Sequence, residues 1–449
     1  MDHEALYRDH VAALDRWLAE SLEIAGRQGV HVDGVLFHSG RPAYYHADDE
    51  PVHFRETPHF RRWAPLTGPE HVVMARPGSP PKVIEVRPSD FWLDTTPAPE
   101  SYWQGVVDHV LVGSYREAIG ALGDDIGRLA YVGSSAEAAA QAWIPAALIE
   151  PAALMAPLDW FRAYKTAWEV DRIEAACKLA AKGHARAHEL HVAGASEHEI
   201  HRGYLEAVGS FENEMPYGGI VAHGAKAGIL HYQNKRTDSR SPVMLIDAGA
   251  SVDGYASDIT RTWAHGDVHE VFKALLEGMD RLERRLVAQV TAGREYVDIH
   301  HATHEGIAEL LSRVGIVTAS AEAALDNDVT LAFMPHGVGH HLGIQVHDVG
   351  GHQAGPEGGK VPPPDRYPAL RTNRTLEAGH VVTIEPGLYF IPMMLDPLRD
   401  NDDTRNLVDW DLVDALMPYG GIRIEDDVVC TDAEPRDLTR PICPGPNET

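Results

Sequence analysis

The sequence predicts an α+β protein with two domains, and three observations support this prediction. A chain of 449 residues exceeds the usual size of one domain and is long enough to bury two separate cores. Helical and strand periodicities both occur, and strand-like segments dominate beyond residue 217. The composition changes through two prolines and an aromatic–basic run at residues 150–165, so we expect the connection there, between domains at 1–160 and 161–449.

Residues 1–160 have the pattern of an α/β domain. Apolar residues recur at helical spacing from Leu6 to Leu22, which predicts an amphipathic helix that ends near Gly26. Residues 32–38 are predicted to form a strand. Apolar runs then alternate with Pro/Gly-rich loops to about residue 155.

The second domain is predicted to begin with helices. Thr166 and Glu169 have the spacing of a capping box, in which the hydroxyl satisfies an early helical N–H and the carboxylate reaches back. A long helix rich in Ala and Lys should follow to about residue 192, and Ser196 with Glu199 repeats the start signal. Two further helices are expected at about 268–290 and 297–313.

Composition and charge exclude several classes of partner. A net charge of −28 disfavours nucleic acids and anionic membranes, which attract basic surfaces. Cys177, Cys430 and Cys443 have no paired spacing, so a disulfide framework is not expected and a reducing compartment fits. The first residues lack the basic start and apolar core of a secretory signal, and no apolar run approaches the ~20 residues that span a bilayer. We therefore expect a soluble, cytoplasmic protein.

The segment from Asp247 to Asp258 carries the strongest functional signal. An apolar strand at 243–247, a turn at Asp253-Gly254 and a return strand at 255–263 read as a β-hairpin. With the turn centred there, Asp247 lies opposite Thr260, and both aspartates project from one face as diagonal neighbours. Two carboxylates this close repel each other unless a cation lies between them or one is protonated. The alternative is an ordinary solvated turn.

Three downstream segments can complete a metal site. A histidine- and glycine-rich stretch contains His336 and His340, Glu385 ends an apolar strand before Pro-Gly, and Glu425 lies in another strand. Arg423 shares the face of Glu425 and can orient or charge-balance it. Carboxylate-rich sites with one imidazole suit Mn²⁺, Co²⁺ or Zn²⁺. Singly, each residue has a structural explanation, such as a surface acid, an ion pair or one of 27 histidines. Together they form a ligand set for two metals.

These residues carry a resemblance to a known family. The order Asp, Asp, His, Glu, Glu within IDAGA…DITRT, PHGVGHHLGIQVHDVGG, TIEPGLYF and GGIRIEDDV resembles the metal-dependent pita-bread peptidases. Among these it is most similar to the bacterial Xaa-Pro dipeptidases (prolidases) and their organophosphorus acid anhydrolase relatives. The resemblance runs from FHSG near residue 38 to beyond Glu425. It implies a catalytic domain in which helices enclose a curved, mostly antiparallel sheet.

The resemblance also implies a binuclear centre with two Mn²⁺-type ions in each subunit. Asp247 would bind one ion, His340 and Glu385 the other, and Asp258 and Glu425 would bridge both. A water shared by two such ions becomes hydroxide near neutral pH and can attack the scissile carbonyl of an Xaa-Pro dipeptide. Glu385 is our candidate for the general base.

Three histidines and several substrate-binding residues follow from the same resemblance. His231 and His347 match positions that contact the substrate or stabilise the intermediate, and His336 matches a position that supports the ligands or handles protons. Each could instead be a hydrogen-bonded histidine of a loop or core. Arg371 falls where prolidases bind the free carboxylate of the substrate, for which a planar guanidinium is suited, although it could be a surface arginine like Arg366 and Arg374.

Aromatic residues are expected around the pocket. Tyr217 and Tyr296 match pocket-lining aromatics of the organophosphate-cleaving relatives, or else they simply pack. Trp92 matches a residue of the N-terminal domain that reaches a neighbouring subunit's pocket, which implies a homodimer, or it packs between domains. We count Arg423 with these substrate-binding residues. The Gly/Pro-rich segment 352–368 and the acidic segment 395–408, which we expect to be a loop, depart from the family pattern and leave substrate preference open.

Three functions compete at this point. The first is a dipeptidase for Xaa-Pro dipeptides, with promiscuous P–F or P–O hydrolysis of organophosphates as an additional activity. The second is an aminopeptidase P that acts on longer peptides. The third is a non-catalytic pita-bread binding protein, but such proteins commonly lose metal ligands and carry basic surfaces. Arg371 and the GHHLGIQVHDVGG segment favour the dipeptidase.

Overall fold

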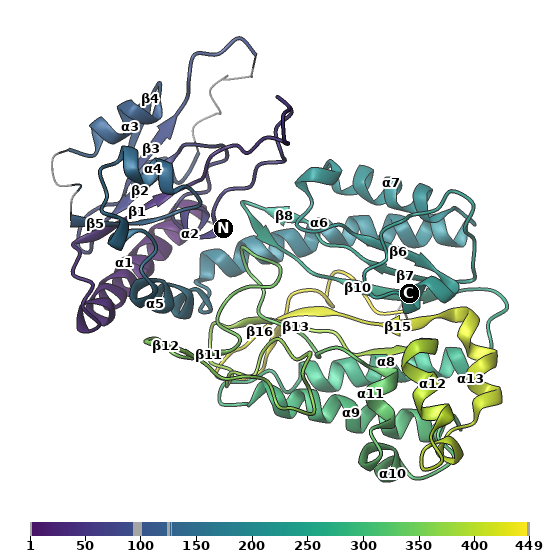
Figure 1. The fold of residues 1–449 in the computed structure, drawn as a ribbon. Helices are drawn as coiled ribbons and strands as arrows, with labels where there is room; N and C mark the ends of the chain where they lie inside the picture. Colours follow the sequence, from purple (N-terminus) through teal and green to yellow (C-terminus); the bar gives the residue numbers. More distant parts are fainter. Residues whose placement is uncertain (1, 93–100, 124–125, 127, 447–449) are drawn as a thin grey trace. The chain divides into compact units, whose positions relative to one another are not determined.

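The computed structural model describes residues 2–92, 101–123, 126 and 128–446 (Figure 1). The chain divides into two compact units. Met1–Glu169 and Gln353–Lys360 form the first unit, and Val170–His352 with Val361–Thr449 form the second. The hairpin of β11 (Gln353–Gly355) and β12 (Gly358–Lys360) therefore belongs with the N-terminal residues, which no local feature of the sequence indicates.

The first unit is built on a five-stranded mixed sheet in the order β4-β3-β2-β1-β5. Its two edge pairs, β3–β4 and β1–β5, are parallel, and the central pairs are antiparallel. The expected first helix is α1, in which the Asp2 side chain accepts the Ala5 N–H and caps the start. The bounds are α1 (His3–Arg27), β1 (Gly34–His38), α2 (Pro58–Trp63), β2 (Val72–Ala75), β3 (Lys82–Val86), β4 (Asp108–Val112), α3 (Tyr115–Ala121), β5 (Leu129–Val132), α4 (Ala136–Gln141) and α5 (Ala152–Arg162).

The helices predicted to open the second domain are present. α6 (Ala167–Val192) begins with the capping box: Glu169 N donates to Thr166 Oγ1, and Thr166 N donates to Glu169 Oε2. α7 (Glu197–Val208) has the second box, between Ser196 and Glu199. The two later predicted helices are α8 (Glu270–Val287) and α9 (Tyr296–Arg313).

The strands of the second unit pair antiparallel in short sheets. β6 (Ile220–His223), β7 (Val243–Asp247) and β10 (Thr260–Ala264) form one sheet in the order β10-β7-β6. The others are β13-β16-β17, β14-β15 and β8-β9, with bounds β8 (Ser251–Val252), β9 (Tyr255–Ala256), β13 (Val381–Ile384), β14 (Gly387–Tyr389), β15 (Gly421–Arg423), β16 (Asp426–Val429) and β17 (Arg436–Asp437). A single bridge between Thr260 and Glu425 joins β10 to the C-terminal strands.

Helices cover both sides of these strands, as expected for a curved sheet enclosed by helices. Figure 1 shows the strands between α6 and α7 on one side and α8 and α9 on the other. α8 and α9 pack closely because each carries a glycine at the contact. A Cβ added at Gly278 would lie 2.3 Å from a Leu310 methyl, and one at Gly306 would lie 2.3 Å from a Leu282 methyl. This interface is part of the main apolar core.

The predicted hairpin has the predicted register. Asp247 pairs with Thr260, and the turn residues Asp253 and Gly254 both have positive φ, 51° and 87°, as a type I′ turn requires. The expected return strand is divided into β9 and β10 because the ladder is interrupted around Asp258. Its backbone N–H donates to the Asp427 carboxylate instead of to a neighbouring strand.

The acidic segment 395–408 is not entirely a loop. α12 (Pro392–Asp400) covers its first part and buries Leu395 in the core, so the expectation of a loop there is wrong. α10 (Ala321–Asp326), α11 (Val329–Phe333) and α13 (Trp410–Leu416) are also short helices that the sequence did not indicate. No helix among the described residues is both long and apolar enough to cross a membrane.

Candidate active site

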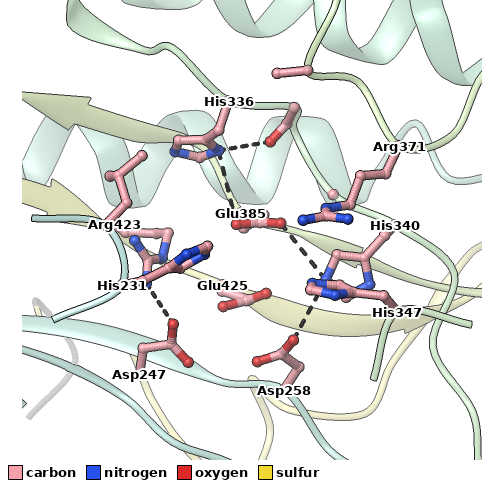
Figure 2. A pocket seen from close by; sticks show the side chains of 14 residues that line it. His231, Asp247, Asp258, His336, His340, His347, Arg371, Glu385, Arg423 and Glu425 are labelled. Atoms are coloured by element: carbon pink, nitrogen blue, oxygen red, sulfur yellow. Dashed lines mark hydrogen bonds and ion pairs between the residues drawn. The ribbon is translucent and has the colours of Figure 1, made fainter. Parts of the chain in front are cut away.

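A cavity of about 200 Å³ opens in the second unit, and the residues predicted for metal binding face it from several elements (Figure 2). Asp247 ends β7, Asp258 precedes β10, Glu385 follows β13 and Glu425 precedes β16. The lining residues are Leu230, His231, Asp247, Asp258, His336, Gly337, Gly339, His340, His347, Ala369, Arg371, Glu385, Arg423 and Glu425.

The loop that carries His340 lies directly on β13 because Gly339 has no side chain. A Cβ at Gly339 would lie 2.1 Å from the Thr383 carbonyl oxygen and 2.3 Å from the Tyr296 hydroxyl. This close approach allows His340 N to donate to Thr383 Oγ1 and Thr383 N to donate to His340 O. The imidazole is thereby held beside Glu385, two residues further along the chain from Thr383.

Three predicted ligands converge without rearrangement. Asp258, His340 and Glu425 are buried, and each offers a donor atom within 4.8 Å of the others. His340 Nε2 lies 3.4 Å from Asp258 Oδ2 and 3.8 Å from Glu385 Oε1. His340 Nδ1 lies 3.0 Å from the His341 carbonyl oxygen, which can only accept, so Nδ1 carries the proton and donates. Metal-binding histidines commonly have this arrangement.

The buried acids of the cavity repel one another. Burial raises the pKa of Asp247, and the charge of Asp258 adds to that rise while Arg423 opposes it. Burial and then the nearby carboxylates raise the pKa of Glu425 well above its usual value. Burial raises the pKa of Glu385 to about 7, against the opposing charges of His340 and Arg423. Four carboxylates and one imidazole fit a divalent cation, since it would allow all four acids to ionise.

Arg423 contacts Asp247 rather than Glu425. Its Nη2 donates to Asp247 Oδ2 at 2.5 Å, its Nη1 to the Tyr389 hydroxyl at 2.9 Å and its Nε to Thr260 Oγ1 at 3.1 Å. The Thr260 hydroxyl in turn donates to Glu425 Oε2 at 2.6 Å. The expected direct orientation of Glu425 is therefore replaced by a link through the Thr260 hydroxyl. Arg423 still balances charge, since its positive charge lowers the pKa of Glu425 against the effect of burial.

Tyr217 completes the surroundings of Asp247. Its hydroxyl donates to Asp247 Oδ1 at 2.8 Å, so each oxygen of this carboxylate has one donor within the protein. Tyr296 occupies a different kind of place. Tyr296 is fully buried and donates to the Thr383 carbonyl at 2.7 Å. Neither Tyr217 nor Tyr296 is among the residues that line the cavity.

His336 is held as a neutral ring. Its Nδ1 donates to the Gly337 carbonyl at 2.8 Å, so its Nε2, 2.9 Å from the Tyr389 hydroxyl, accepts. Burial and the charge of Arg423 lower its pKa to about 3. The Nδ1 atom also lies 3.9 Å from Glu385 Oε2.

The lining also contains His231, His347 and Arg371; in Figure 2, His347 and Arg371 lie on the side of His340, whereas His231 lies on the side of Arg423. The His347 ring meets His340 edge-on with 4.4 Å between centroids, and burial followed by the charges of His340 and Arg371 lowers its pKa to about 4. Within the described part of the chain, the guanidinium of Arg371 forms no hydrogen bond or ion pair.

Trp92 belongs to the first unit and its residue is 81% exposed. It stacks at a tilt on Phe91, and residues 93–100, which follow it, lie outside the described residues. Contact with a neighbouring subunit therefore stays a prediction.

Sequence reasoning missed three supporting residues. Thr260 and Tyr389 link Arg423 to the acids and to His336. Asp427 accepts the Asp258 N–H at 3.0 Å and the Cys177 thiol at 3.2 Å. Asp427 could have been found, because the alternation of side chains along a strand places it on the same face as Glu425.

Comparisons with known proteins agree with this architecture. Residues 171–432 match the model of metallopeptidase family M24, and residues 5–160 match the N-terminal domain of Xaa-Pro dipeptidases. An Xaa-Pro dipeptidase of Xanthomonas campestris is 41% identical over 444 residues, 98% of both chains. One from Stenotrophomonas maltophilia is 39% identical over 443 residues, again 98% of both.

Solved structures share the fold at lower identity. Aminopeptidase P from E. coli with the inhibitor Pro-Leu has a TM-score of 0.70 and 21% identity, with 97% of each chain covered. Aminopeptidase PepP of Pseudomonas aeruginosa has a TM-score of 0.68 and 24% identity, with 96% of each covered. The chain therefore belongs to metallopeptidase family M24, with the pita-bread fold, and within it to the Xaa-Pro dipeptidases.

Proposed function

We propose that this protein hydrolyses Xaa-Pro dipeptides with the help of two divalent metal ions. One observation carries the proposal: four carboxylates and His340 converge in a cavity that also contains the guanidinium of Arg371, which has no partner among the described residues. A dipeptide presents a scissile carbonyl and a free carboxylate only a few bonds apart. The cavity offers a site for each.

The metal ligands follow from the donor set. Asp247 would hold one ion, His340 and Glu385 the other, and Asp258 and Glu425 would be shared. Carboxylate oxygens dominate this set, which supports Mn²⁺ over ions that prefer nitrogen or sulfur. When bound, two such ions supply a nucleophile by lowering the pKa of a shared water and polarise the scissile carbonyl.

The protein's own groups move the protons and stabilise charge. Glu385 is the proposed general base: its carboxylate takes a proton from the attacking water and passes it to the leaving proline nitrogen. His231 and His347 are proposed to donate hydrogen bonds to the oxygen that becomes negative as the carbonyl is attacked. His336 cannot serve Glu385 as a donor through Nδ1 while that atom donates to Gly337, so its proposed role is to support the wall beside Glu385.

Recognition of the substrate's free end is assigned to Arg371. A guanidinium can donate two parallel hydrogen bonds to a carboxylate, and such charge-assisted pairs are the strong ones. The cavity of about 200 Å³ is smaller than the ~300–1,000 Å³ of pockets for drug-sized ligands, which supports a dipeptide rather than a longer peptide. The names of the relatives at 39–41% identity agree with this choice. The alternative, an aminopeptidase P, rests on fold neighbours at 21–24% identity.

Three further features complete the proposal. Organophosphates with P–F or P–O bonds are additional substrates, since the same nucleophile can attack phosphorus and Tyr217 lies beside Asp247. The exposed pair Phe91 and Trp92 supports a homodimer in which Trp92 reaches the neighbouring pocket. Cys177, Cys430 and Cys443 are all unpaired, which supports a reducing compartment such as the cytoplasm.

The test compares Ala-Pro with Ala-Pro-Ala, using protein stripped of metal and then supplied with Mn²⁺. We expect metal-dependent cleavage of the dipeptide alone. Cleavage of the tripeptide would instead make the protein an aminopeptidase P. Failure to cleave either, with metal bound, would contradict peptide hydrolysis and leave phosphotriesters as the substrates to try.

A further inference from the structure

Four histidines gather in the second unit away from the cavity of Figure 2. His188 and His191 lie on the last turns of α6, His223 is the last residue of β6, and His265 directly follows β10. None of them lines the cavity. None of them has a role in the proposed hydrolysis of dipeptides.

The sheet register brings these side chains to one face. β6 and β10 both run antiparallel to β7, so their C-terminal residues lie at the same end of the sheet. His223 and Trp263 both pair with Met244 and therefore share a face, and His265 follows Trp263 by two residues. Figure 1 shows α6 beside β6, β7 and β10. α6 covers this face, since its His188 stacks on Trp263 with 4.0 Å between ring centroids.

His191 lies at the centre of the group. Its ring centroid is 4.6 Å from that of His265 and 5.3 Å from that of His223. His191 and His223 are only 1% and 3% exposed. Among the described residues, the Nε2 atoms of both rings are buried and have no hydrogen-bond partner.

The proton positions turn these two atoms into electron-pair donors. His223 Nδ1 lies 3.2 Å from the Ser239 carbonyl oxygen, which can only accept, so Nδ1 carries the proton. The Pro242 carbonyl oxygen, which can only accept, favours a proton on the His191 ring. Because His191 Nε2 is buried without a partner, that proton is placed on Nδ1. Both Nε2 atoms therefore carry a lone pair. Histidines that bind metals usually hold the other ring N–H in such a contact with a carbonyl.

The buried Nε2 atoms of His191 and His223 are not protonated near neutral pH. Burial, followed by the neighbouring His223 and His265, lowers the pKa of His191 to about 3. Burial also lowers the pKa of His223. Near neutral pH both rings are neutral and each buries an unused acceptor, which is unfavourable unless a donor or a cation approaches.

We propose that His191, His223 and His265 bind one Zn²⁺, or a similar ion that prefers imidazole, at a site separate from the catalytic centre. Three imidazoles suit Zn²⁺, Cu²⁺ or Ni²⁺, whereas Mn²⁺ prefers carboxylates. The basic side chains nearest His223 are already paired: Lys226 with Glu197 at 3.1 Å and Arg240 with Glu199 at 3.3 Å. His265 is partly exposed, so a fourth position is open to water.

Closing this site requires one side chain to turn. Unlike those of Asp258, His340 and Glu425, the three donor atoms do not all lie within 4.8 Å of one another. His191 and His223 are buried, and His223 is also held by its hydrogen bond to the Ser239 carbonyl, so the partly exposed His265 is the ring that rotates inward. His265 is therefore the substitution that removes binding with the least effect on the core.

The experiment uses the full-length protein saturated with Mn²⁺ and then titrated with Zn²⁺, followed by gel filtration and elemental analysis. We expect one Zn²⁺ to be retained in addition to the Mn²⁺. We expect His265→Ala and His223→Gln each to weaken Zn²⁺ binding by at least about 10–100-fold. This is the usual loss when a residue that only hydrogen-bonds to a metal ligand is removed. The exposed His198 on α7 provides the matched control, and H198A should bind as the wild type does.

A spectroscopic readout separates this site from the catalytic one. Cu²⁺ bound by several imidazoles gives an electron paramagnetic resonance spectrum with coupling to several nitrogens, whereas the catalytic donor set has a single imidazole. We expect the multi-nitrogen signal in the wild type and in H198A, and its loss in H265A. Retention of Zn²⁺ and of that signal in a folded H265A protein, or Zn²⁺ uptake only in exchange for Mn²⁺, would overturn the proposal.

Discussion

Arg423 donates a hydrogen bond to Asp247 Oδ2, although Glu425 is its close neighbour in the sequence. The same guanidinium donates to Tyr389 and, through Thr260, is linked to Glu425. The Arg423 guanidinium therefore positions two of the proposed metal ligands, Asp247 and Glu425, which are more than 170 residues apart in the sequence.

The first prediction concerns the planar shape of the Arg423 guanidinium. Arg423→Lys keeps the charge but cannot reach three partners in one plane, so Asp247 and Thr260 should lose their fixed orientation. We expect kcat to fall by about 10–100-fold, together with the affinity for metal. Steady-state kinetics and a metal titration check this. Arg436→Lys, in the exposed ion pair with Glu174, should leave both quantities unchanged.

The second prediction uses the repulsion among the acids. Asp258→Asn removes a charge from the proposed shared ligands, so activity should fall by more than about 100-fold and metal content should drop. Without metal, the same variant should be more stable than the wild type at pH 8, on the order of 1 kcal/mol, because fewer carboxylates repel each other. With Mn²⁺ the order of stability should reverse.

Thermal unfolding with EDTA and with Mn²⁺ tests this crossover. Asp267→Asn, at an exposed position after β10, is the matched control and should show no reversal. Full activity in D258N would contradict a role for Asp258 as a ligand. A variant that is less stable than the wild type under both conditions would show that Asp258 serves the fold rather than a metal.

Local features of the sequence predicted the hairpin and the helix starts. The Asp253-Gly254 turn needs two residues with positive φ, and this requirement alone sets Asp247 opposite Thr260. The capping boxes at Thr166 and Ser196 depend on residues three positions apart. Such short-range chemistry can be read without knowledge of the fold.

Long-range contacts could not be predicted in this way. The ladder breaks at Asp258 because its N–H is taken by Asp427, 169 residues away. The partner of Arg423 depends on how β7, β10 and β15 meet, and the hairpin at 353–360 joins a unit that is otherwise N-terminal. The motif signalled which residues matter, but only the fold decides which of them touch.

The third prediction concerns acid stability and a histidine of the first unit. His10 is fully buried, donates from Nε2 to the Arg62 carbonyl and accepts the Thr166 hydroxyl at Nδ1, each at 2.8 Å. Burial lowers its pKa from 6.5 to about 4, in spite of the charge of Glu169. Between these pH values the unfolded chain binds a proton that the folded protein does not. Stability present above pH 6.5 is therefore lost as the pH falls toward 4, by at most about 3 kcal/mol.

His10→Gln tests this because its amide can still donate to the Arg62 carbonyl but does not titrate. We expect denaturant unfolding to give a flatter dependence of stability on pH between 6.5 and 4 than in the wild type. His31→Gln changes an exposed histidine of the same unit and should leave the slope as it is. An unchanged slope in H10Q would mean that other groups cause the acid sensitivity.

The fourth prediction separates binding of the substrate's carboxylate from the chemistry. Arg371→Ala should raise KM for Xaa-Pro dipeptides by about 10–100-fold, since a charge-assisted hydrogen bond contributes about 1.5–3 kcal/mol. Because Arg371 has no partner within the described residues, its removal leaves no buried group unsatisfied and the fold should be unaffected. A neutral phosphotriester has no carboxylate to bind, so its KM should change little.

Arg366→Ala, at an exposed arginine paired with Asp328 at 2.8 Å, is the control for loss of charge near this loop. Equal increases in KM for both substrate classes would show that Arg371 shapes the cavity in general and does not recognise the carboxylate.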